Sequence, residues 1–337
     1  MSIDEFLTEW NSDSLYVRVQ TSGSTGTPKQ MLVEKQRMLN SARITCDFLG
    51  LKSGDTALLC MSLDYIAGKM MVVRAIERNM RLVAVEPSGH PLGTQREQTL
   101  CDSLRFSQEG QSPCVDFAAM VPLQVYNTLQ VAEEKERLRQ IRHLIIGGGA
   151  IDELAEELKA FPNAVWSTYG MTETLSHIAL RRLSGPEASE WYMPFPSVSV
   201  SLSDEGCLVI DAPEVCAERL VTNDIAELAT QNGQSVRFRI LGRKDNVICS
   251  GGIKIQAEEV ERLLRPYLKV PYLITKRKDR KFGEVVVLLT EGDTDEAREA
   301  CERVLPKFQH PKDYVHVDHI PMTATGKPAR KEAEKLA

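Results

Sequence analysis

The stretch with the most evident chemistry is a loop near the N-terminus that combines glycines, hydroxyl side chains and a lysine. It consists of Thr21, Ser22, Gly23, Ser24, Thr25, Gly26, Thr27, Pro28 and Lys29. Glycines let the backbone approach a ligand closely, while hydroxyls, free N–H groups and an ammonium suit a polyphosphate. The loop is not a Walker motif, which requires GxxxxGK[ST]. A flexible Ser/Gly turn is the alternative, but the position directly after a strand-like run and the Pro-Lys ending favour a phosphate loop.

Five further segments carry residue types with chemical potential. They are the glycine turn 147–150, the aromatic-Gly-Met-Thr-Glu segment 169–174, the Thr-Asn-Asp triplet 222–224, the stretch 242–261 and the Thr-Gly-Lys segment 321–327. In this order, and together with the first loop, they resemble the motifs of the adenylate-forming superfamily, which contains acyl- and aryl-CoA synthetases, peptide-synthetase adenylation domains and luciferases. Six ordered resemblances along the whole chain make chance a poor explanation.

The resemblance implies activation of a carboxylic acid by ATP, which gives an acyl adenylate and pyrophosphate, followed by transfer to CoA with release of AMP. Because the first step brings an anionic carboxylate to an anionic phosphate, placed cations should supply much of the catalysis. Lys327 is therefore expected to bridge the carboxylate and α-phosphate oxygens, and a solvated tail lysine is the alternative. Glu173, beside Thr172, is expected to hold Mg²⁺, which takes one or two carboxylates plus phosphate oxygens. An acidic helix cap is the alternative for Glu173.

The resemblance also implies the nucleotide contacts. Asp224 can accept hydrogen bonds from the ribose diol, Arg243 can donate to the sugar or to phosphate, and Tyr169 can stack on adenine or wall the acyl pocket. Surface salt bridges and ordinary core packing are the alternatives. The expected ATP and AMP site consists of Thr21, Ser22, Gly23, Ser24, Thr25, Gly26, Thr27, Lys29, Gly148, Gly149, Ala150, Tyr169, Gly170, Met171, Thr172, Asp224 and Arg243.

The C-terminal motifs imply movement between the two steps. Asp245 corresponds to the family's hinge, and Gly251 and Gly252 correspond to a loop that borders the pantetheine channel of CoA. A simple hairpin turn also explains two glycines. The basic run 276–281 either meets the CoA nucleotide phosphates or is a solvated loop.

Two segments bear on the acid. Residues 61–68 are similar to a family gate beside the acyl pocket, with Tyr65 where His is common, and residues 168–176 are similar to the compact o-succinylbenzoate-CoA ligases of menaquinone biosynthesis. Such an acid has a second carboxylate that needs a cation or several donors. The expected acyl-pocket residues are Tyr65, Lys69, Arg74, Ser176 and His177; helix surface or a satisfied histidine are the alternatives. Transfer to a carrier protein and a non-catalytic adenylate- or acyl-binding role remain open as alternative functions.

The elements that must position these segments alternate between strand and helix over the first half of the chain. Hydrophobic spacing predicts strands at 16–20, 56–61, 81–86 and 143–146, and helices at 38–49, 68–78, 131–140 and 152–160, the last capped by Asp152. This alternation predicts a largely parallel sheet covered by helices. Short β runs from 191 to 239 predict a small antiparallel subdomain, and helices at 257–264 and 294–304 with strands at 272–275 and 284–290 predict a final α+β domain.

The expected fold is thus an N-terminally shortened adenylate-forming enzyme of the α/β class. Its AMP-binding domain spans 1–244, divided into an α/β part (1–190) and a small β subdomain (191–244), and a mobile α+β domain spans 245–337. Because the phosphate loop begins as early as Thr21, the acyl pocket is expected to be more open, differently covered or completed by another subunit, so a homodimer is one open arrangement.

Composition sets the remaining limits. The 337 residues are 42% hydrophobic and 26% charged with a formal net charge of −6, which excludes disordered and collagen-like classes and gives no reason to expect a nucleic-acid or membrane partner. Eight cysteines without a CxxC pair indicate neither a zinc site nor a redox dithiol, and are expected to be reduced and mostly buried. Without a signal-like N-terminus or a run of about 20 apolar residues, a cytoplasmic protein is expected.

Overall fold

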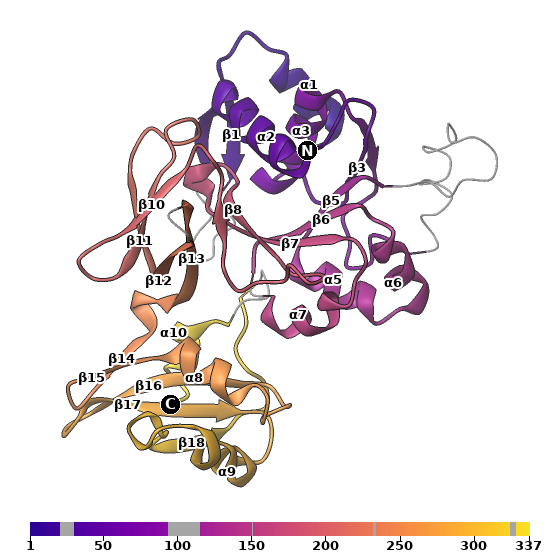
Figure 1. Cartoon of the computed structure of the whole chain (residues 1–337). Helices are drawn as coiled ribbons and strands as arrows, with labels where there is room; N and C mark the ends of the chain where they lie inside the picture. The colour runs from indigo at the N-terminus through magenta and orange to yellow at the C-terminus, as the bar shows by residue number, and fades with distance from the viewer. Residues whose placement is uncertain (21–29, 94–114, 150, 232–233, 324–327) are drawn as a thin grey trace. The chain divides into compact units, whose positions relative to one another are not determined.

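The computed structural model describes residues 1–20, 30–93, 115–149, 151–231, 234–323 and 328–337 (Figure 1). The chain divides into two compact units. The first comprises Met1–Val200, Ile210–Arg219 and Thr230–Arg237, and the second comprises Ser201–Val209, Leu220–Ala229 and Phe238–Ala337. The predicted domain boundary at Asp245 stays a prediction.

The first unit is built on a seven-stranded sheet in the order β4-β3-β5-β6-β7-β8-β9. The first five of these strands run parallel, and β8 and β9 are added antiparallel. The bounds are β3 Thr56–Leu59, β4 Arg81–Ala84, β5 Phe117–Met120, β6 His143–Ile146, β7 Ala164–Gly170, β8 His177–Arg182 and β9 Met193–Pro194. The prediction of a largely parallel sheet is confirmed.

Helices cover both faces of this sheet (Figure 1). One face carries α2 (Lys35–Leu49) and α3 (Ile66–Arg78), while α5 (Pro122–Leu129), α6 (Ala132–Arg139) and α7 (Asp152–Lys159) lie on the other. Helices α5, α6 and α7 share one apolar core with the sheet. Its residues include Leu58, Leu144, Val125, Leu138 and Leu158. Helix α7 packs through Leu154 and Leu158 as predicted, but Ile151 occupies its N-cap position, so the predicted N-cap at Asp152 is wrong by one residue.

A separate hairpin precedes the main sheet. Strand β1 (Tyr16–Gln20) has the predicted bounds, but it pairs antiparallel with β2 (Gln30–Glu34), which the sequence patterns did not indicate. Helix α1 (Ile3–Trp10) was also not predicted; a capping box formed by Ser2 and Glu5 starts it, and Phe6 is buried. The sequence predicts a strand, a loop and a helix here, whereas the structure has a second strand, β2, between the loop and the helix.

The predicted region of short β runs forms a four-stranded sheet in the order β10-β11-β12-β13. Its strands are β10 Ser199–Leu202, β11 Cys207–Asp211, β12 Leu220–Gln231 and β13 Gln234–Arg243. The division between the two units runs through this sheet, because segments of its strands belong to each of them.

The remainder of the second unit is a five-stranded sheet with helices. Strands β15-β14-β17-β16 follow in this order, and β18 pairs parallel with β17. The bounds are β14 Val247–Ser250, β15 Ile253–Gln256, β16 Tyr272–Asp279, β17 Gly283–Thr290, β18 Asp313–His316, α8 Ala257–Leu264, α9 Thr294–Val304 and α10 Arg330–Ala333. The core joins α8 and α9 to the sheet through Val260, Leu264, Ala297 and Leu288. The predicted helices and the strands at 272–275 and 284–290 are confirmed.

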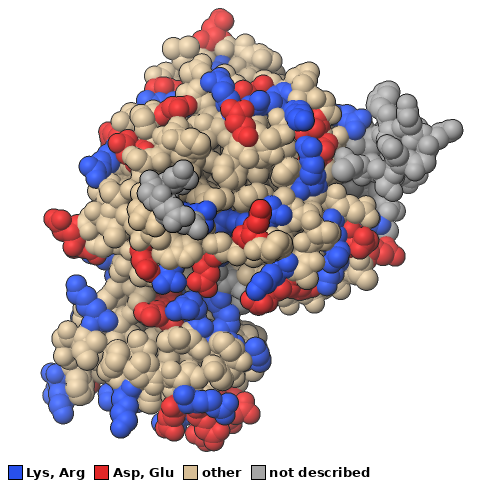
Figure 2. All heavy atoms as spheres, viewed as in Figure 1, with Lys and Arg blue, Asp and Glu red and all other residues tan. Residues whose placement is uncertain are grey.

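Basic and acidic side chains are interspersed over the face seen in Figure 2, in keeping with the small net charge. Within the described ranges, no helix combines the length and the apolar composition required to cross a bilayer. No disulfide joins the six cysteines that the structure describes, and Cys46, Cys60, Cys207 and Cys301 are buried.

Candidate active site

Three of the predicted motifs meet at the carboxyl edge of the parallel sheet. The gate segment 61–68 begins just after β3 and runs into α3, the glycine turn follows β6, and the segment that begins at Tyr169 starts at the end of β7. Parallel strands bring their carboxyl ends to one edge, where open α/β sheets bind ligands. The register pairs Ile146 with Ser167, so the glycine turn lies directly beside the start of the Tyr169 motif.

The glycines of the turn are required by close packing. A Cβ on Gly147 would lie 2.3 Å from Thr168 Oγ1, and one on Gly149 would lie 3.2 Å from Pro122 Cγ. Gly148 has φ +86°, a conformation that other residues adopt only with strain. The turn therefore brings its backbone against β7 and the start of α5, while Gly148 and Gly149 stay exposed. Ala150 lies outside the described residues.

Glu173 lies on a short 3₁₀ turn, Thr172–Thr174, whose hydrogen bonds close it tightly. Thr174 Oγ1 accepts from the Met171 N–H at 3.0 Å and lies 2.7 Å from the Ser176 carbonyl oxygen, to which it can donate. A Cβ on Gly170 would lie 2.2 Å from that same carbonyl, so only glycine fits there. Glu173 itself is exposed, and no described cation pairs with it. Its carboxylate is thus presented on a fixed turn.

The segment after Thr174 is strained. Leu175 is buried with φ +66° and ψ −36°, which is unusual for a residue with a branched side chain. A register shift between Tyr169 and Gly170 accompanies it where β7 pairs with β8. The half-buried Tyr169 ring lies 5.7 Å from the ring of Tyr192.

The nine residues of the predicted phosphate loop, 21–29, lie outside the described residues, but their two ends do not. Gln20 and Gln30 are paired across the β1–β2 hairpin, and Gln20 also forms a parallel bridge with Tyr65. The ends of the loop are therefore adjacent to each other and to the gate segment.

Lys69 is 3% exposed, and its ammonium is directed at β1. Nζ donates to the Arg18 carbonyl oxygen at 2.8 Å and lies 5.5 Å from the centre of the Phe6 ring. Burial lowers the pKa of Lys69, and the charges of Glu9 and Asp64 oppose that effect.

Arg74 is a buried cation, with 2% of its surface exposed. Its Nη2 donates to Ser176 Oγ at 2.7 Å, the guanidinium lies 6.0 Å from the centre of the Phe117 ring, and its buried Nε has no hydrogen-bond partner. No carboxylate among the described residues pairs with it. Burial lowers the pKa of Arg74 to about 10, which leaves the side chain charged near neutral pH.

His177 continues this contact into a hydrogen-bonded chain. Its Nδ1 lies 3.1 Å from Ser176 Oγ, its Nε2 lies 3.1 Å from Thr45 Oγ1, and Thr45 donates to the Ser41 carbonyl oxygen at 3.0 Å. Since a carbonyl only accepts, Thr45 must accept from His177 Nε2–H, which leaves Nδ1 to accept from Ser176. Burial, with the nearby charge of Arg74, holds the pKa of His177 well below its usual value. The chain therefore contains a neutral imidazole.

A small pocket of about 180 Å³ lies beside His177 in the same unit. Apart from His177 and Ser41 its lining is apolar, with Ile44, Ile178, Phe195, Val198 and Val215. The predicted acyl residues thus divide into two groups: Arg74, Ser176 and His177 form one connected cluster, whereas Tyr65 and Lys69 contact β1.

In the second unit, Arg243 joins two predicted site residues. Its Nη1 donates to Asp224 Oδ1 at 3.3 Å and its Nη2 donates to Asp245 Oδ2 at 3.2 Å. Thr222 Oγ1 accepts from the Asp224 N–H at 3.1 Å and fixes the backbone there. One guanidinium thus links the residue predicted to bind the ribose with the residue predicted to be the hinge.

Gly251 and Gly252 form the exposed turn between β14 and β15, with φ values of +57° and +85°. This agrees with the hairpin alternative and leaves the CoA-channel role a prediction. In the basic run, Lys276 pairs with Glu284 at 3.0 Å and Arg277 pairs with Asp313, so two of its cations have acidic partners.

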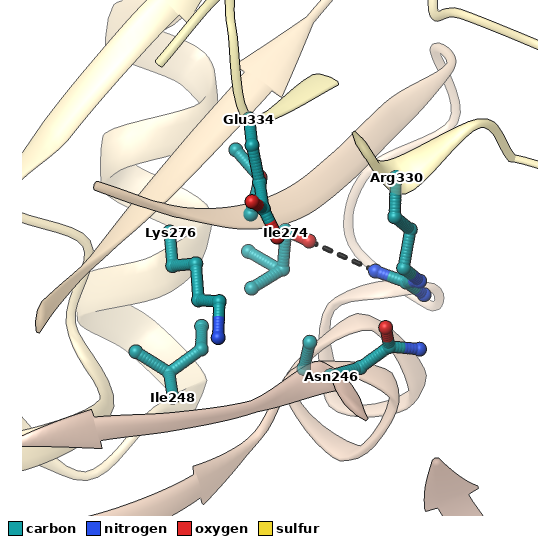
Figure 3. Close-up of a pocket in the computed structure, with 8 residues that line it drawn as sticks. Asn246, Ile248, Ile274, Lys276, Arg330 and Glu334 are labelled. Carbon is teal, nitrogen blue, oxygen red and sulfur yellow. Dashed lines mark hydrogen bonds between the residues drawn. The ribbon is translucent and has the colours of Figure 1, made fainter. Parts of the chain in front are cut away.

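Lys327 lies outside the described residues, but both flanks of its segment are held. Met322 and Pro328 form an antiparallel bridge, and the Ala329 N–H donates to the Pro321 carbonyl oxygen at 2.8 Å. Arg330 follows at the start of α10 and points into a small pocket of about 220 Å³ in the second unit, where it donates to the Ile274 carbonyl oxygen at 2.9 Å (Figure 3).

Comparison with known proteins identifies the family. The profile of the AMP-binding enzyme family matches residues 5–216, which is more than half of the chain. The chain belongs to the AMP-binding enzymes. The family match confirms the predicted resemblance to adenylate-forming enzymes. It also confirms the predicted enzyme class, an AMP-forming acid–thiol ligase.

Relatives of this AMP-binding enzyme include the 2-succinylbenzoate–CoA ligase of Enterococcus faecalis, 26% identical over 98% of this chain and 71% of the relative. Among solved structures, an acyl-CoA synthetase (AMP-forming)/AMP-acid ligase II-like protein from Dyadobacter fermentans is 29% identical with a TM-score of 0.62, covering 99% of this chain and 93% of that one. The Bacillus subtilis o-succinylbenzoate coenzyme A synthetase, in complex with ATP and magnesium ion, is 22% identical with a TM-score of 0.71, covering 94% and 69%. The last likeness shows the shared fold.

Sequence patterns missed several residues that hold this AMP-binding enzyme's motifs in place. Thr45, Glu9, Glu261 and Arg330 were not assigned a role. Arg74 was predicted for the acyl pocket with helix surface as the alternative, and the sequence contains a signal against that alternative: within the stretch of α3 from Gly68 to Ala75, which is buried, one lysine and one arginine stand among otherwise apolar residues. Such a pattern indicates buried charges rather than helix surface.

Proposed function

We propose that this AMP-binding enzyme is a carboxylic acid–CoA ligase that uses ATP and Mg²⁺ and whose acid is o-succinylbenzoate. The relatives named as 2-succinylbenzoate–CoA ligases support the reaction and the acid, because they align with nearly the whole chain. About one residue in four is identical between them and this chain, so the choice of acid also depends on the chemistry of the site.

The burial of Arg74 without a carboxylate partner among the described residues is the observation on which the proposal rests. A buried guanidinium without a described carboxylate partner is costly unless an anion reaches it. An acid with two carboxylates supplies that anion while its other carboxylate reacts. Ser176 accepts a hydrogen bond from the guanidinium and is itself bonded to the neutral His177, while the Arg74 Nε remains able to donate. An acid with a single carboxylate would leave this cation unpaired.

The remaining residues take roles around the triphosphate. The 21–29 loop is proposed to hold the ATP phosphates, the 147–150 turn and Tyr169 the adenine, and Asp224 with Arg243 the ribose. Glu173 suits Mg²⁺, because its exposed carboxylate is fixed on a closed turn and this ion needs only one or two carboxylates beside phosphate oxygens. When bound, Mg²⁺ would neutralise phosphate charge. Lys327 is proposed to pair with the carboxylate and α-phosphate during adenylation.

The second step requires CoA to reach the acyl adenylate. We propose that the domain 245–337 pivots at Asp245, which moves Lys327 away and brings Gly251 and Gly252 to the thiol channel. The contact of Arg243 with both Asp224 and Asp245 supports a pivot at this position, because it ties the hinge to the ribose residue.

The experiment is an assay of both half-reactions with a panel of acids. Purified protein is incubated with ATP, Mg²⁺, CoA and either o-succinylbenzoate, analogues that each lack one of its carboxylates, or benzoate. The proposal expects AMP and a thioester with o-succinylbenzoate and much lower kcat/KM with each analogue. Pyrophosphate exchange without a CoA thioester would instead indicate a carrier-protein acceptor, and nucleotide binding without exchange would indicate a non-catalytic protein.

A further inference from the structure

Strand β1 has one edge that no strand among the described residues covers along most of its length. Its other edge pairs with β2 through five residue pairs, among them Arg18 with Leu32. On the uncovered edge the Arg18 N–H donates to Glu9 Oε1 at 2.9 Å, and the Arg18 carbonyl oxygen accepts from Lys69 Nζ at 2.8 Å. Both polar groups of one backbone residue are therefore bound by charged side chains from α1 and α3.

Of these two contacts, the one made by Lys69 is partly buried, and the one made by Glu9 lies nearer the surface. Lys69 is 3% exposed, and Glu9 is half-buried with a second oxygen, Oε2, that is buried without a hydrogen-bond partner. The carboxylate stabilises the ammonium electrostatically, and the Phe6 ring lies below it. Burying a lysine costs free energy, so its placement against one backbone carbonyl and the Met1 sulfur, with no described carboxylate bonded to it, needs a reason.

We infer that Lys69 and Glu9 are positioning residues for the 21–29 loop, acting through the backbone of Arg18. The inference rests on the proposed function, in which this loop holds the ATP phosphates. Arg18 lies two residues before the end of β1 at Gln20, where the loop begins. A strand that could slide along its uncovered edge would displace the start of the loop, and misplacement by about 1 Å costs a large factor in catalysis.

This role differs from the acyl-pocket role expected for Lys69. Its ammonium is occupied by β1, whereas the Arg74 cluster contains Ser176 and His177 and not Lys69. The two roles predict losses toward different substrates: a loop-positioning lysine affects ATP, and an acyl-pocket lysine affects the acid.

The test compares ATP and AMP binding in Lys69→Met by calorimetry, with KM values from acid-dependent pyrophosphate exchange. We expect the Kd and KM for ATP to rise about 10-fold, because a buried carbonyl loses its donor. AMP affinity and the KM for the acid should stay within about 2-fold, since AMP lacks the β- and γ-phosphates. Lys69→Arg, which keeps a cationic donor, should recover most of the ATP affinity.

Two further variants complete the design. Lys35→Met is the matched control, because Lys35 also donates to a backbone carbonyl, that of Ser12 at 2.8 Å, but not on the β1 edge; it should leave ATP affinity unchanged. Glu9→Ala removes the acceptor of the Arg18 N–H and should reproduce the ATP-selective loss, which keeps the inference testable if Lys69→Met does not fold.

An acid-selective loss in Lys69→Met, an equal loss for ATP and AMP, or no loss would overturn the inference. A wild-type protein that shows no acid-dependent pyrophosphate exchange would instead overturn the proposed function. The two failures are therefore distinguishable in one set of measurements.

Discussion

Arg330 and Glu261 form a bidentate ion pair in the second unit. Nη1 donates to Oε1 at 3.0 Å and Nη2 donates to Oε2 at 2.8 Å, and both side chains are largely buried. The pair joins α10, which directly follows the Lys327 segment, to α8 and, through the Ile274 carbonyl, to β16. Arg330, together with the buried Ala333, thus attaches the end of the chain to the core of the second unit.

Breaking this pair should destabilise the unit. Removing one partner leaves a buried charge without compensation, so Arg330→Met is expected to lower the free energy of unfolding by about 3–5 kcal/mol. Arg277→Met is the matched control, because Arg277 pairs with Asp313 in the same unit while both are exposed, and it should cost less than about 1 kcal/mol. Urea denaturation followed by circular dichroism measures both. Equal costs would show that the buried pair contributes no more than a surface one.

Lys327→Ala should separate the two half-reactions. Loss of the cation proposed to stabilise charge in the adenylation transition state is expected to slow acid-dependent pyrophosphate exchange by about 10²–10³-fold. Thioester formation from a supplied acyl adenylate should change far less, because that step follows the proposed movement of the domain. Rapid-quench assays of each half-reaction make the comparison, and equal losses would contradict the proposed pivot at Asp245.

Arg74→Gln should weaken recognition of the second carboxylate. A charged hydrogen bond contributes roughly 1.5–3 kcal/mol, so the KM for o-succinylbenzoate is expected to rise about 10–150-fold, with a smaller change for an analogue that lacks that carboxylate. Thr45→Val is the control, because it alters the far end of the same hydrogen-bonded chain without removing the cation. If both acids lose the same factor in Arg74→Gln, the guanidinium serves packing and not recognition.

The neutral His177 should make stability depend on pH. Its pKa in the folded state lies well below the usual 6.5, whereas the unfolded chain takes up a proton near 6.5. Below that pH the unfolded state therefore binds more protons, and stability should fall by up to about 1.4 kcal/mol per pH unit from this group. His177→Asn should flatten this part of the curve in urea denaturation between pH 5 and 7. Burial also lowers the pKa of His143, so His143 contributes to the loss of stability over the same pH range. Its contribution should be present both in the wild-type protein and in His177→Asn. An unchanged slope in His177→Asn would assign the effect elsewhere.

Much of the fold follows from local patterns. Strands such as β1 and β6 and helices such as α2 and α3 are visible in the sequence, because apolar spacing reports which face is buried. Strand β2 and helix α1 escaped: Gln30–Glu34 is short and leads directly into a helix, and α1 buries only Phe6. Pairing across the 21–29 loop is a long-range choice that no local pattern specifies.

The candidate site was predictable as a set of segments but not as a geometry. Motif order placed Tyr169 and the glycine turn, and the parallel topology then required them to meet. The separate destinations of Lys69 and Arg74, five residues apart on α3, depend on what each side chain reaches in three dimensions. Arg330 lay in a polar tail that resembled solvated surface, and only its contact with Glu261 reveals its burial.

In the proposed function, the acid is also the counter-ion of the buried Arg74 guanidinium in the folded protein. A ligand that binds only the folded state stabilises it by RT ln(1 + [L]/Kd), about 2.7 kcal/mol at one hundred times Kd. A dicarboxylate that pairs with the guanidinium would therefore raise the free energy of unfolding of the enzyme that uses it as a substrate. The melting temperature should then rank the acids by charge complementarity before any turnover is measured.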